Sequence, residues 1–405
     1  MPSFGPKRAS GMIFASLVLC LDVNLHLEGI NNTSESFIRE ELRLEDFSSA
    51  KTQAELDSLI SDREKGLMTT GTFAFVKGAG AVGDSTVELW FLFYELPIII
   101  LSPTLGYDDR SGWTAGLILG FPNLWGRAHK GRMGGYLGGQ NALTAGYIKP
   151  STPGHPGAFD ISVFWGSLRW EHEDMSEKRT SAALSLGRAF RWPNIMKLGA
   201  HYEKRLFDTT GISMGGDSSD ELLGWTISWE RGDLDNPMNP KHGTSVGISF
   251  SSSHEIGSQG SFQGLSVSAN GFGTLRRTTI AARLRLDMFS SETPYYKRQY
   301  LGGLYALRSY PYPTETGPSR LLLTLEARNL IYTWTHPAIP FPAEFYLVPF
   351  AEAGALGTGE DFRGYLWGAG LGGGVFTLAS GYLGGDVSIN GDGKLGFHAY
   401  VGWLF

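Results

Sequence analysis

A single cysteine, Cys20, occurs among the 405 residues, so no disulfide can form within the chain. Charge is also scarce: 18% of the residues are charged, and the formal net charge of −6 gives no sign of nucleic-acid binding. Long apolar runs are missing as well. The best candidates, residues 11–21 and 96–101, are far shorter than the roughly 20 apolar residues that a helix needs to cross a bilayer. Helical membrane spans are therefore excluded.

Glycine and aromatic residues are plentiful, with 55 Gly, 24 Phe, 16 Tyr and 11 Trp in a chain that is 42% hydrophobic. Strands of a membrane barrel hide their apolar surface by alternation, in segments of about 10 residues that turn residues separate. The composition favours such a barrel. A soluble β-sandwich or lectin-like protein has a similar composition and stays open as an alternative at this point.

The first 21 residues are typical of a secretory signal peptide. Lys7 and Arg8 precede the apolar stretch 11–21, as a positively charged start precedes the apolar core of such signals. Residues 17–20, L-V-L-C, offer a second interpretation, a lipoprotein box with a lipidated Cys20. Because Leu19 is unfavourable directly before a lipidated cysteine, we predict an ordinary signal peptide over residues 1–21.

Residues 22–97 show the mixed pattern of a small α/β domain. The expected elements are, in order, a strand at 23–27, helices at about 34–42 and 52–67, and strands at 72–76 and 86–94. Thr33 or Ser34 can cap the first helix, and the second helix carries an apolar stripe. The last two strands alternate in polarity and are expected to pair across a Gly-rich turn.

From residue 98 to residue 405 helical periodicity disappears, and about sixteen alternating segments follow one another between turns rich in Gly, Asn, Asp and Pro. In residues 280–288 apolar side chains take every second position, and Arg283, Arg285 and Asp287 lie between them. Such charges belong in a wet lumen behind a lipid-facing wall. The sequence therefore predicts a mostly β protein: a 16-stranded antiparallel transmembrane β-barrel over 98–405 that follows one small α/β domain.

Six short motifs resemble those of one family. The barrel motifs are F-P-N-L-W-G-R at 121–127, the segment 229–244 with N-P-M-N-P, and L-G-G-L-Y-A-L-R-S-Y at 301–310. The domain motifs are E-G-I-N-N-T at 28–33, E-E-L at 40–42 and T-G-T-F at 70–73. Residues 23–405 thus resemble the BamA-type outer-membrane assembly and translocation barrels, the bacterial surface antigen barrels. The resemblance implies one POTRA domain at 22–97, where the BamA-type insertase carries several.

The resemblance implies that the sixth extracellular loop folds into the lumen. Arg308 is then the inserted arginine and Tyr310 its aromatic neighbour, while Ser309 replaces the usual glycine. Alternation on the next two strands points Glu326 and Glu352 into the lumen. Because a guanidinium in a confined lumen needs carboxylates, we predict an ion pair of Arg308 with Glu326, Glu352 or both. A solvent-exposed arginine is the alternative.

The resemblance also implies a seam that opens sideways between the first barrel strand, about 101–107, and the last, about 395–405. Gly396 and Gly402 are expected to weaken pairing at that seam. The strand at 72–76 is expected to offer a second free edge. An incoming polypeptide strand can add to edges of this kind through main-chain hydrogen bonds.

Two enzyme-like patterns carry little weight. G-I-S-M-G at 211–215 matches a nucleophile elbow around Ser213, but that elbow needs a strand before it and a helix after it, and neither is expected here. E-H-E-D at 171–174 suggests a metal cluster, yet neighbouring strand residues point to opposite faces. We expect no catalytic residue, no metal and no cofactor.

The resemblance implies a bacterial outer-membrane location with the POTRA-like domain in the periplasm, and Trp403 and Phe405 resemble the terminal targeting signal of bacterial barrels. The expected partners are unfolded outer-membrane or secreted polypeptides, the lipid bilayer and accessory periplasmic or lipoprotein subunits, without nucleic acid. The expected function is insertion of outer-membrane proteins or polypeptide translocation by strand addition. Two alternatives remain: a reduced barrel that serves as a structural element, passive pore or display anchor, and an outer-membrane hydrolase built on Ser213.

Overall fold

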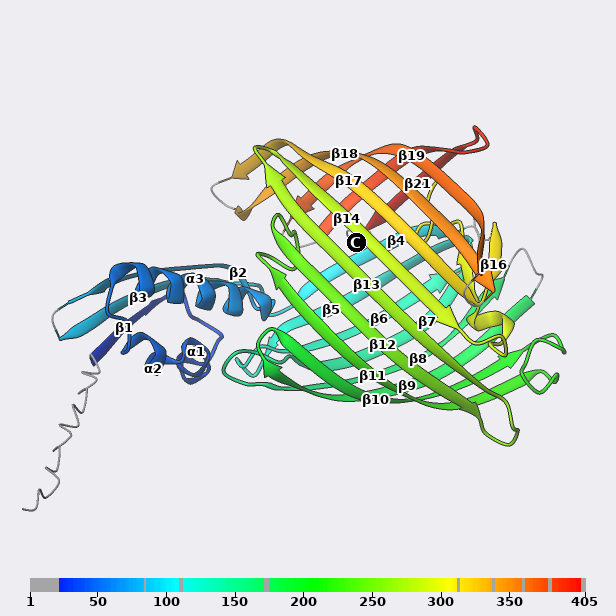
Figure 1. The fold of residues 1–405 in the computed structure, drawn as a ribbon, viewed down its shortest axis with the longest axis horizontal. Helices are drawn as coiled ribbons and strands as arrows, with labels where there is room; N and C mark the ends of the chain where they lie inside the picture. The colour runs from blue at the N-terminus through cyan, green and yellow to red at the C-terminus, as the bar shows by residue number, and fades with distance from the viewer. Residues whose placement is uncertain are drawn as a thin grey trace, which may run out of the picture.

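The computed structural model describes residues 22–83, 85–108, 112–170, 175–311, 314–336, 339–358, 361–377 and 381–401. Figure 1 shows a small α/β region that projects from one end of a large β-barrel. The protein is mostly β, as the alternating sequence predicts. The signal peptide expected at 1–21 lies outside the described residues.

The α/β region has the expected order of elements and one additional short helix. Its elements are β1 (Asp22–Glu28), α1 (Glu35–Leu42), α2 (Leu44–Phe47), α3 (Gln53–Thr69), β2 (Phe73–Val82) and β3 (Thr86–Glu95). β3 lies in the middle of the sheet, parallel to β1 and antiparallel to β2. Arg43, in a left-handed conformation with φ of 51°, ends α1 and separates it from α2. The Thr52 hydroxyl accepts a hydrogen bond from the Glu55 backbone N–H at 3.2 Å and caps α3.

β2 is longer than the predicted strand at 72–76, and it includes glycines that the sequence assigns to a turn. Gly78 and Gly80 pair with residues of β3 inside the sheet. A Cβ on Gly78 would come within 2.5 Å of Ile60 in α3. These glycines therefore let α3 lie close to the sheet, a tertiary contact that the local sequence does not show.

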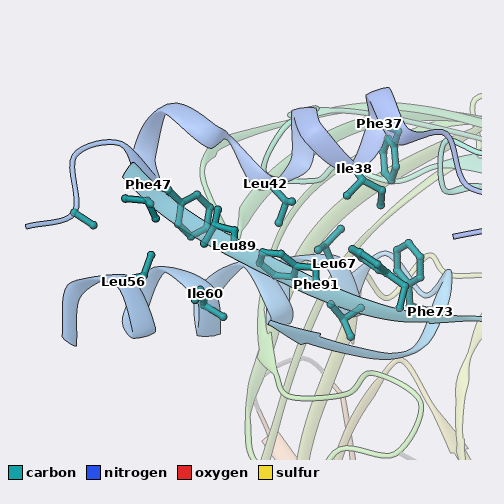
Figure 2. Close-up of a cluster of buried hydrophobic side chains, with 14 of the residues drawn as sticks. Phe37, Ile38, Leu42, Phe47, Leu56, Ile60, Leu67, Phe73, Leu89 and Phe91 are labelled. Atoms are coloured by element: carbon teal, nitrogen blue, oxygen red, sulfur yellow. The ribbon is translucent and has the colours of Figure 1, made fainter. Parts of the chain in front are cut away.

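The helices cover one face of this sheet (Figure 2). Their apolar side chains meet those of β2 and β3 in one buried cluster that includes Phe37, Ile38, Leu42, Phe47, Leu56, Ile60, Leu67, Phe73, Leu89 and Phe91. Burying a large apolar side chain contributes about 1.5–3 kcal/mol, so the region has a core of its own. In the described part of the chain, no helix combines the length and the apolar character that a membrane crossing requires.

The barrel is a 16-stranded antiparallel sheet. Its strands are, in order, β4 (Ile100–Asp108), β5 (Gly112–Leu124), β6 (His129–Gly138), β7 (Gln140–Lys149), β8 (Gly157–Trp170), β9 (Met175–Arg191), β10 (Asn194–Phe207), β11 (Ser219–Leu234), β12 (Gly243–Glu255), β13 (Ser261–Leu275), β14 (Thr278–Phe289), β17 (Ser319–His336), β18 (Ile339–Thr358), β19 (Asp361–Thr377), β20 (Gly381–Asn390) and β21 (Leu395–Val401). The sheet curls until β4 and β21, its two ends, nearly close the barrel (Figure 1). On β14, Ile280 and Leu284 are exposed outside and Asp287 is buried inside, which is the predicted split.

The turn between β5 and β6 fastens the α/β region to the barrel. The Ser34 backbone N–H donates to the Gly126 carbonyl at 2.9 Å, and the Asn123 amide donates to the Thr33 hydroxyl at 2.8 Å. Ala128 is fully buried in the apolar core of the α/β region. The motif at 121–127 therefore forms part of the junction between the two parts of the chain.

A buried carboxylate fastens a second barrel turn, the one between β7 and β8. Glu41 of α1 accepts hydrogen bonds from the Thr152 hydroxyl at 2.5 Å and from the Gly154 backbone N–H at 3.0 Å. His155 lies with Nδ1 at 2.7 Å from Glu41 and with Nε2 at 2.6 Å from Glu40. Two adjacent turns of the barrel thus hold the start of α1 and its end.

We expect Gly126→Ala to loosen this junction more than Gly211→Ala does. Both glycines have positive φ, 68° and 85°, so alanine strains the backbone at both. Only at Gly126 would the new Cβ also meet another atom, the Asn32 carbonyl oxygen at 2.6 Å, because nothing lies within 4 Å at Gly211. Limited proteolysis should release the α/β region several-fold faster from Gly126→Ala. Equal rates in the two variants would contradict this junction.

Candidate functional site: a loop folded into the barrel lumen

The segment between β14 and β17 folds into the barrel, and we call it the lumen loop. It contains the 3-10 helix η2 (Tyr295–Lys297) and the short strands β15 (Gln299–Leu301) and β16 (Glu315–Gly317), which pair with each other. Leu301, Leu307 and Tyr310 pack against Leu322 of β17 in a buried cluster. The apolar side chains of the motif at 301–310 thus position its arginine.

Arg308 is the centre of a charge cluster in the lumen. Its side chain is 2% exposed, and its Nη2 lies 2.7 Å from the Glu326 carboxylate. Glu352 and Asp386 each approach the guanidinium to 3.5 Å, at Nε and at Nη1. The ring of Phe350 lies beneath the guanidinium, with its centroid 3.6 Å from Cζ. One cation therefore faces three carboxylates, which come from β17, β18 and β20.

Two further arginines of β17 pair with buried carboxylates, and one of them shares Glu326 with Arg308. Arg328, two residues from Glu326 on the same face of β17, donates from Nε to Glu326 at 3.0 Å. Arg320, further along β17, donates to Asp287 of β14 at 2.8 Å. Buried charges are tolerated only when they are paired and hydrogen-bonded. These pairs therefore hold the loop and the wall strands in one arrangement.

Ser309 makes one hydrogen bond more than a glycine would. Its backbone N–H donates to Glu352 at 2.7 Å, and its hydroxyl donates to the same carboxylate oxygen. The facing strand leaves room for this side chain, because a Cβ on Gly368 would lie 2.0 Å from the Ser309 Oγ. The serine that replaces the usual glycine of the motif is thus matched by a glycine on β19.

Tyr310 holds the other side of the turn. Its hydroxyl donates to the Trp367 carbonyl at 3.2 Å and accepts from the Gly391 backbone N–H at 3.1 Å. Trp367 lies on β19, and Gly391 directly follows β20. Together, Arg308, Ser309 and Tyr310 contact four consecutive strands of the wall, β17 to β20.

The seam lies beside this wall. In the described residues no hydrogen-bonded ladder joins β4 to β21, although they are the two ends of one sheet. From the sequence we expect Gly396 to weaken pairing at the seam. The structure gives a second reason for a glycine at this position of β21: a Cβ there would lie 2.8 Å from the Ser388 Oγ and 3.3 Å from the Arg308 carbonyl oxygen. Gly402, Trp403 and Phe405 fall outside the part of the chain that the structure describes.

The family model described as the Omp85 superfamily domain matches residues 123–402, which is more than half of the chain. The chain belongs to the Omp85 superfamily. The family resemblance found in the sequence motifs is thereby confirmed.

Solved structures share the fold of this Omp85 protein. BamA from Haemophilus ducreyi lacking POTRA domains 1-3 is 15% identical with a TM-score of 0.57, and the match covers 94% of this chain and 84% of that chain. CdiB from Escherichia coli is 14% identical with a TM-score of 0.65, over 95% of this chain and 77% of that chain. CdiB from Acinetobacter baumannii is 13% identical with a TM-score of 0.59, over 95% and 74%. No curated protein sequence matches the chain.

The structure of this Omp85 barrel adds one carboxylate, Asp386, that sequence reasoning missed. On β20 the buried side chains of Tyr382 and Asp386 alternate with the exposed ones of Leu383 and Val387. The alternation that placed Glu326 in the lumen is thus present on β20 too. Applied to this strand, it would have identified the third partner of the arginine.

A second charge cluster in the Omp85 barrel holds the start of the lumen loop, and no motif marks it. Lys297 pairs with Glu203 of β10 at 2.8 Å, and Arg205 pairs with Glu203 and with Glu177 of β9 at 2.6 Å each. The Tyr296 hydroxyl donates to a buried carboxylate of β11. The loop therefore crosses from β9–β11 to β17–β20, at the end of the barrel opposite the α/β region (Figure 1).

The sequence predicts only a turn between β11 and β12, in the motif at 229–244. In the structure this turn also contacts β18. The Asn239 amide donates to Glu344 at 2.8 Å and to the Tyr346 hydroxyl at 3.0 Å. Met238 packs on the apolar cluster around Tyr346, which Leu304 of the lumen loop joins as well. Segments from both ends of the Omp85 barrel thus meet on one part of its wall.

The serine of the pattern at 211–215 forms its hydrogen bonds within the segment that joins β10 to β11. Ser213 lies between β10 and β11, where its hydroxyl donates to the carbonyl and to the carboxylate of Asp217, at 2.9 Å each. Between these strands the described residues contain no helix of the kind that a nucleophile elbow needs. The pattern at 171–174 lies outside the described residues. Within them, no group of three or more His, Cys, Asp or Glu side chains could hold a metal ion.

Replacing Arg308 with alanine should destabilise the folded barrel by about 3–5 kcal/mol, because three buried carboxylates would lose their common cation. Arg308→Lys should restore only part of the loss, since an ammonium is a point charge and not a planar fork. Urea unfolding in detergent micelles measures both variants. Arg363→Ala, at an exposed position, is the control and should stay within about 0.5 kcal/mol of the unmodified chain. An Arg308→Ala result equal to this control would exclude the stabilising role.

Gly368→Ala should cost about 1–3 kcal/mol through overpacking against Ser309. In a Ser309→Gly background the same change should cost at least about 0.5 kcal/mol less, because the side chain that the new Cβ meets is gone. Gly373→Ala on the same strand is the control, since its Cβ would meet only the Tyr346 carbonyl oxygen, at 3.5 Å. Strictly additive unfolding free energies for Gly368 and Ser309 would show that the two residues do not touch.

Proposed function

We propose that this Omp85 protein inserts polypeptides into the outer membrane or translocates them across it. Membership in the superfamily and the fold shared with BamA and CdiB support this general role. The seam carries the finer proposal. In the described residues β4 and β21 end one sheet and have no ladder between them. The seam is therefore the proposed place of action.

An unpaired strand edge can accept another strand. Each edge presents a row of backbone N–H and C=O groups, and an incoming segment can bond to them. Main-chain bonds give affinity that does not depend on the sequence of side chains, which suits a protein that handles many unfolded polypeptides. We place the client segment on β4 or β21 while the seam is open, with its apolar side chains turned to the lipid bilayer.

The lumen loop is positioned to support one side of that seam. The Ser388 hydroxyl of β20 donates to the Arg308 carbonyl at 3.4 Å, and Gly396 of β21 lies against the same carbonyl. The charge cluster around Arg308 holds this loop tip in place. In the proposed mechanism the loop keeps β20 and β21 in shape while the facing edge, β4, moves away.

β2 offers a second free edge. The sheet order β1-β3-β2 leaves one side of β2 without a strand partner among the described residues. We assign the α/β region to the periplasm as a POTRA-like domain over 22–97. There it would meet unfolded polypeptides and accessory subunits before they reach the barrel.

A reversible disulfide across the seam tests strand addition. One cysteine is placed in β4 and one in β21, at facing positions with Cβ atoms about 3.5–4.5 Å apart, in a chain that carries Cys20→Ser. We expect the oxidised protein to lose function, because a closed seam offers no edge. Loss of other barrel proteins from the outer membrane of depleted cells, or retention of secreted polypeptides, measures the function. Reductant should restore it.

A matched lock joins β13 to β14 through Val267→Cys and Leu286→Cys, which face each other in the ladder. It should leave function unchanged, since these strands are already bonded along their length. Full activity of the oxidised seam-locked protein would contradict strand addition at the seam. Normal levels of other barrel proteins and of secreted polypeptides after depletion of the chain itself would instead favour a structural or passive barrel.

A further inference from the structure

The outer wall of the barrel has an apolar depression of about 650 Å³ that crosses from β5 to β10. Gly135, Ala145 and Ala182 line it with no side chain or a small one, and beside them Leu143 and Trp165 are 60% and 63% exposed. Alternation places all five on the lipid-facing side of their strands. We call this depression, with these five residues in its lining, the outer groove.

The strand register brings cations to one end of the outer groove. Thr180 of β9, which also lines the groove, lies opposite Trp165 in the β8–β9 ladder and opposite Lys204 in the β9–β10 ladder. Lys178 precedes Thr180 on the same side of β9, and Arg169 lies near the end of β8. The three cationic side chains are exposed, at the end of the barrel opposite the α/β region (Figure 1).

These cations are neighbours and have few anionic partners. Arg169 and Lys178 are diagonal neighbours on adjacent strands, and so are Lys178 and Lys204, which places the Cα atoms of each pair about 7–8 Å apart. Lys204 lies 3.5 Å from Glu221 in an exposed pair, which neutralises it only weakly. Among the described residues, no carboxylate lies within 4.0 Å of Arg169 or Lys178. Such adjacent like charges repel one another until an anion binds between them.

The position of the outer groove fits a lipid better than a soluble anion. Trp165 borders the groove next to the cations, as tryptophan does at the level where acyl chains meet headgroups. An acyl chain in the groove would contact side walls as well as a floor, and each additional contact adds dispersion energy. Elsewhere on the outer wall, Arg363 of β19 is exposed next to Tyr365, which is itself 75% exposed. That arginine therefore stands beside a protruding side chain, and it serves below as a control.

We propose that the outer groove and its three cations bind a lipid that carries several acyl chains and more than one phosphate group. The acyl chains would lie in the groove, and the phosphates would lie between Arg169, Lys178 and Lys204, where charge-assisted hydrogen bonds can form. Cations from three adjacent strands exceed what the single phosphate of a phospholipid can pair. The ligand is therefore a phosphorylated glycolipid of the leaflet on the side away from the α/β region. This inference goes beyond the proposed function, because it needs no polypeptide client.

Native mass spectrometry of the full chain, released from detergent micelles, tests the proposal. The probe is lipid A with two phosphate groups, titrated against the chain to give a dissociation constant. Monophosphoryl lipid A has the same acyl chains and one phosphate fewer, and phosphatidylglycerol has a single phosphate and two acyl chains. We expect the diphosphoryl form to bind at least about fivefold more tightly than either comparison lipid.

Matched variants separate the cations from general charge effects. Lys178→Ser should raise the dissociation constant of diphosphoryl lipid A about fivefold, and its combination with Lys204→Ser should raise it further by a similar factor. Arg363→Ser removes the same charge from β19 and should leave the dissociation constant unchanged.

A second pair of variants tests the groove itself. Ala182→Trp fills the outer groove and should weaken the binding of both forms of lipid A, because the acyl chains lose their place. Ala269→Trp makes the same change on the lipid-facing side of β13, outside the groove, and should leave binding unchanged. Thermal melting checks the fold of every variant, and the groove pair keeps the test valid if a lysine variant folds poorly.

Three results would overturn the inference. One is equal affinity for the diphosphoryl and monophosphoryl lipids, and another is unchanged binding in both Lys178→Ser and Ala182→Trp. The third is displacement of the lipid by excess inorganic phosphate at constant ionic strength, which would indicate a site for a free anion. An equal loss of binding in Arg363→Ser and Lys178→Ser would likewise replace the specific site with a general effect of charge.

Discussion

The buried guanidinium of Arg308 is the interaction on which the arrangement of the lumen depends. An ion at 2% exposure needs partners, since desolvating an unpaired charge costs several kcal/mol. Carboxylates from β17, β18 and β20 therefore converge on the guanidinium. The loop that carries Arg308 must reach into the barrel to the depth of these carboxylates. Gly368 and Gly396 follow from the same requirement, because side chains at these positions would occupy the space of the loop tip.

Segments from both ends of the barrel meet on the wall that β17 to β20 form. The lumen loop crosses to it from the cluster around Lys297, and the turn that contains Asn239 reaches β18 from the other end. Met238 of this turn and Leu304 of the loop contact one apolar cluster. The wall ends at β21, whose outer edge has no ladder with β4 in the described residues. Among the described residues the barrel thus combines a cross-linked wall with an edge that has no ladder partner, and this edge is where we propose that a client strand is added.

In the α/β region, too, one side of the sheet is packed and the other is exposed. Its helices bury one face of the sheet, and Glu41 and the Gly126 carbonyl tie it to two barrel turns. The opposite face keeps Trp90 and Leu92 exposed, and the chain runs from there directly into β4. Contacts at both ends of α1 would hold the α/β region at a constant separation from the barrel.

Alternation along the chain determined which residues form strands and on which side of the wall each side chain lies, because polarity of period two depends only on local geometry. Glu326 and Glu352 could be assigned to the lumen in this way, and by the same rule Asp386 could have been. Alternation could not predict three other contacts, which are those of Gly78 with α3, of Lys297 with Glu203 and of Asn239 with Glu344. They join residues that local pattern does not relate, up to 105 positions apart. Only the curvature and closure of the sheet decided which inward side chains face one another, since partners across a lumen are set by the strand order around the barrel and not by the spacing along the chain.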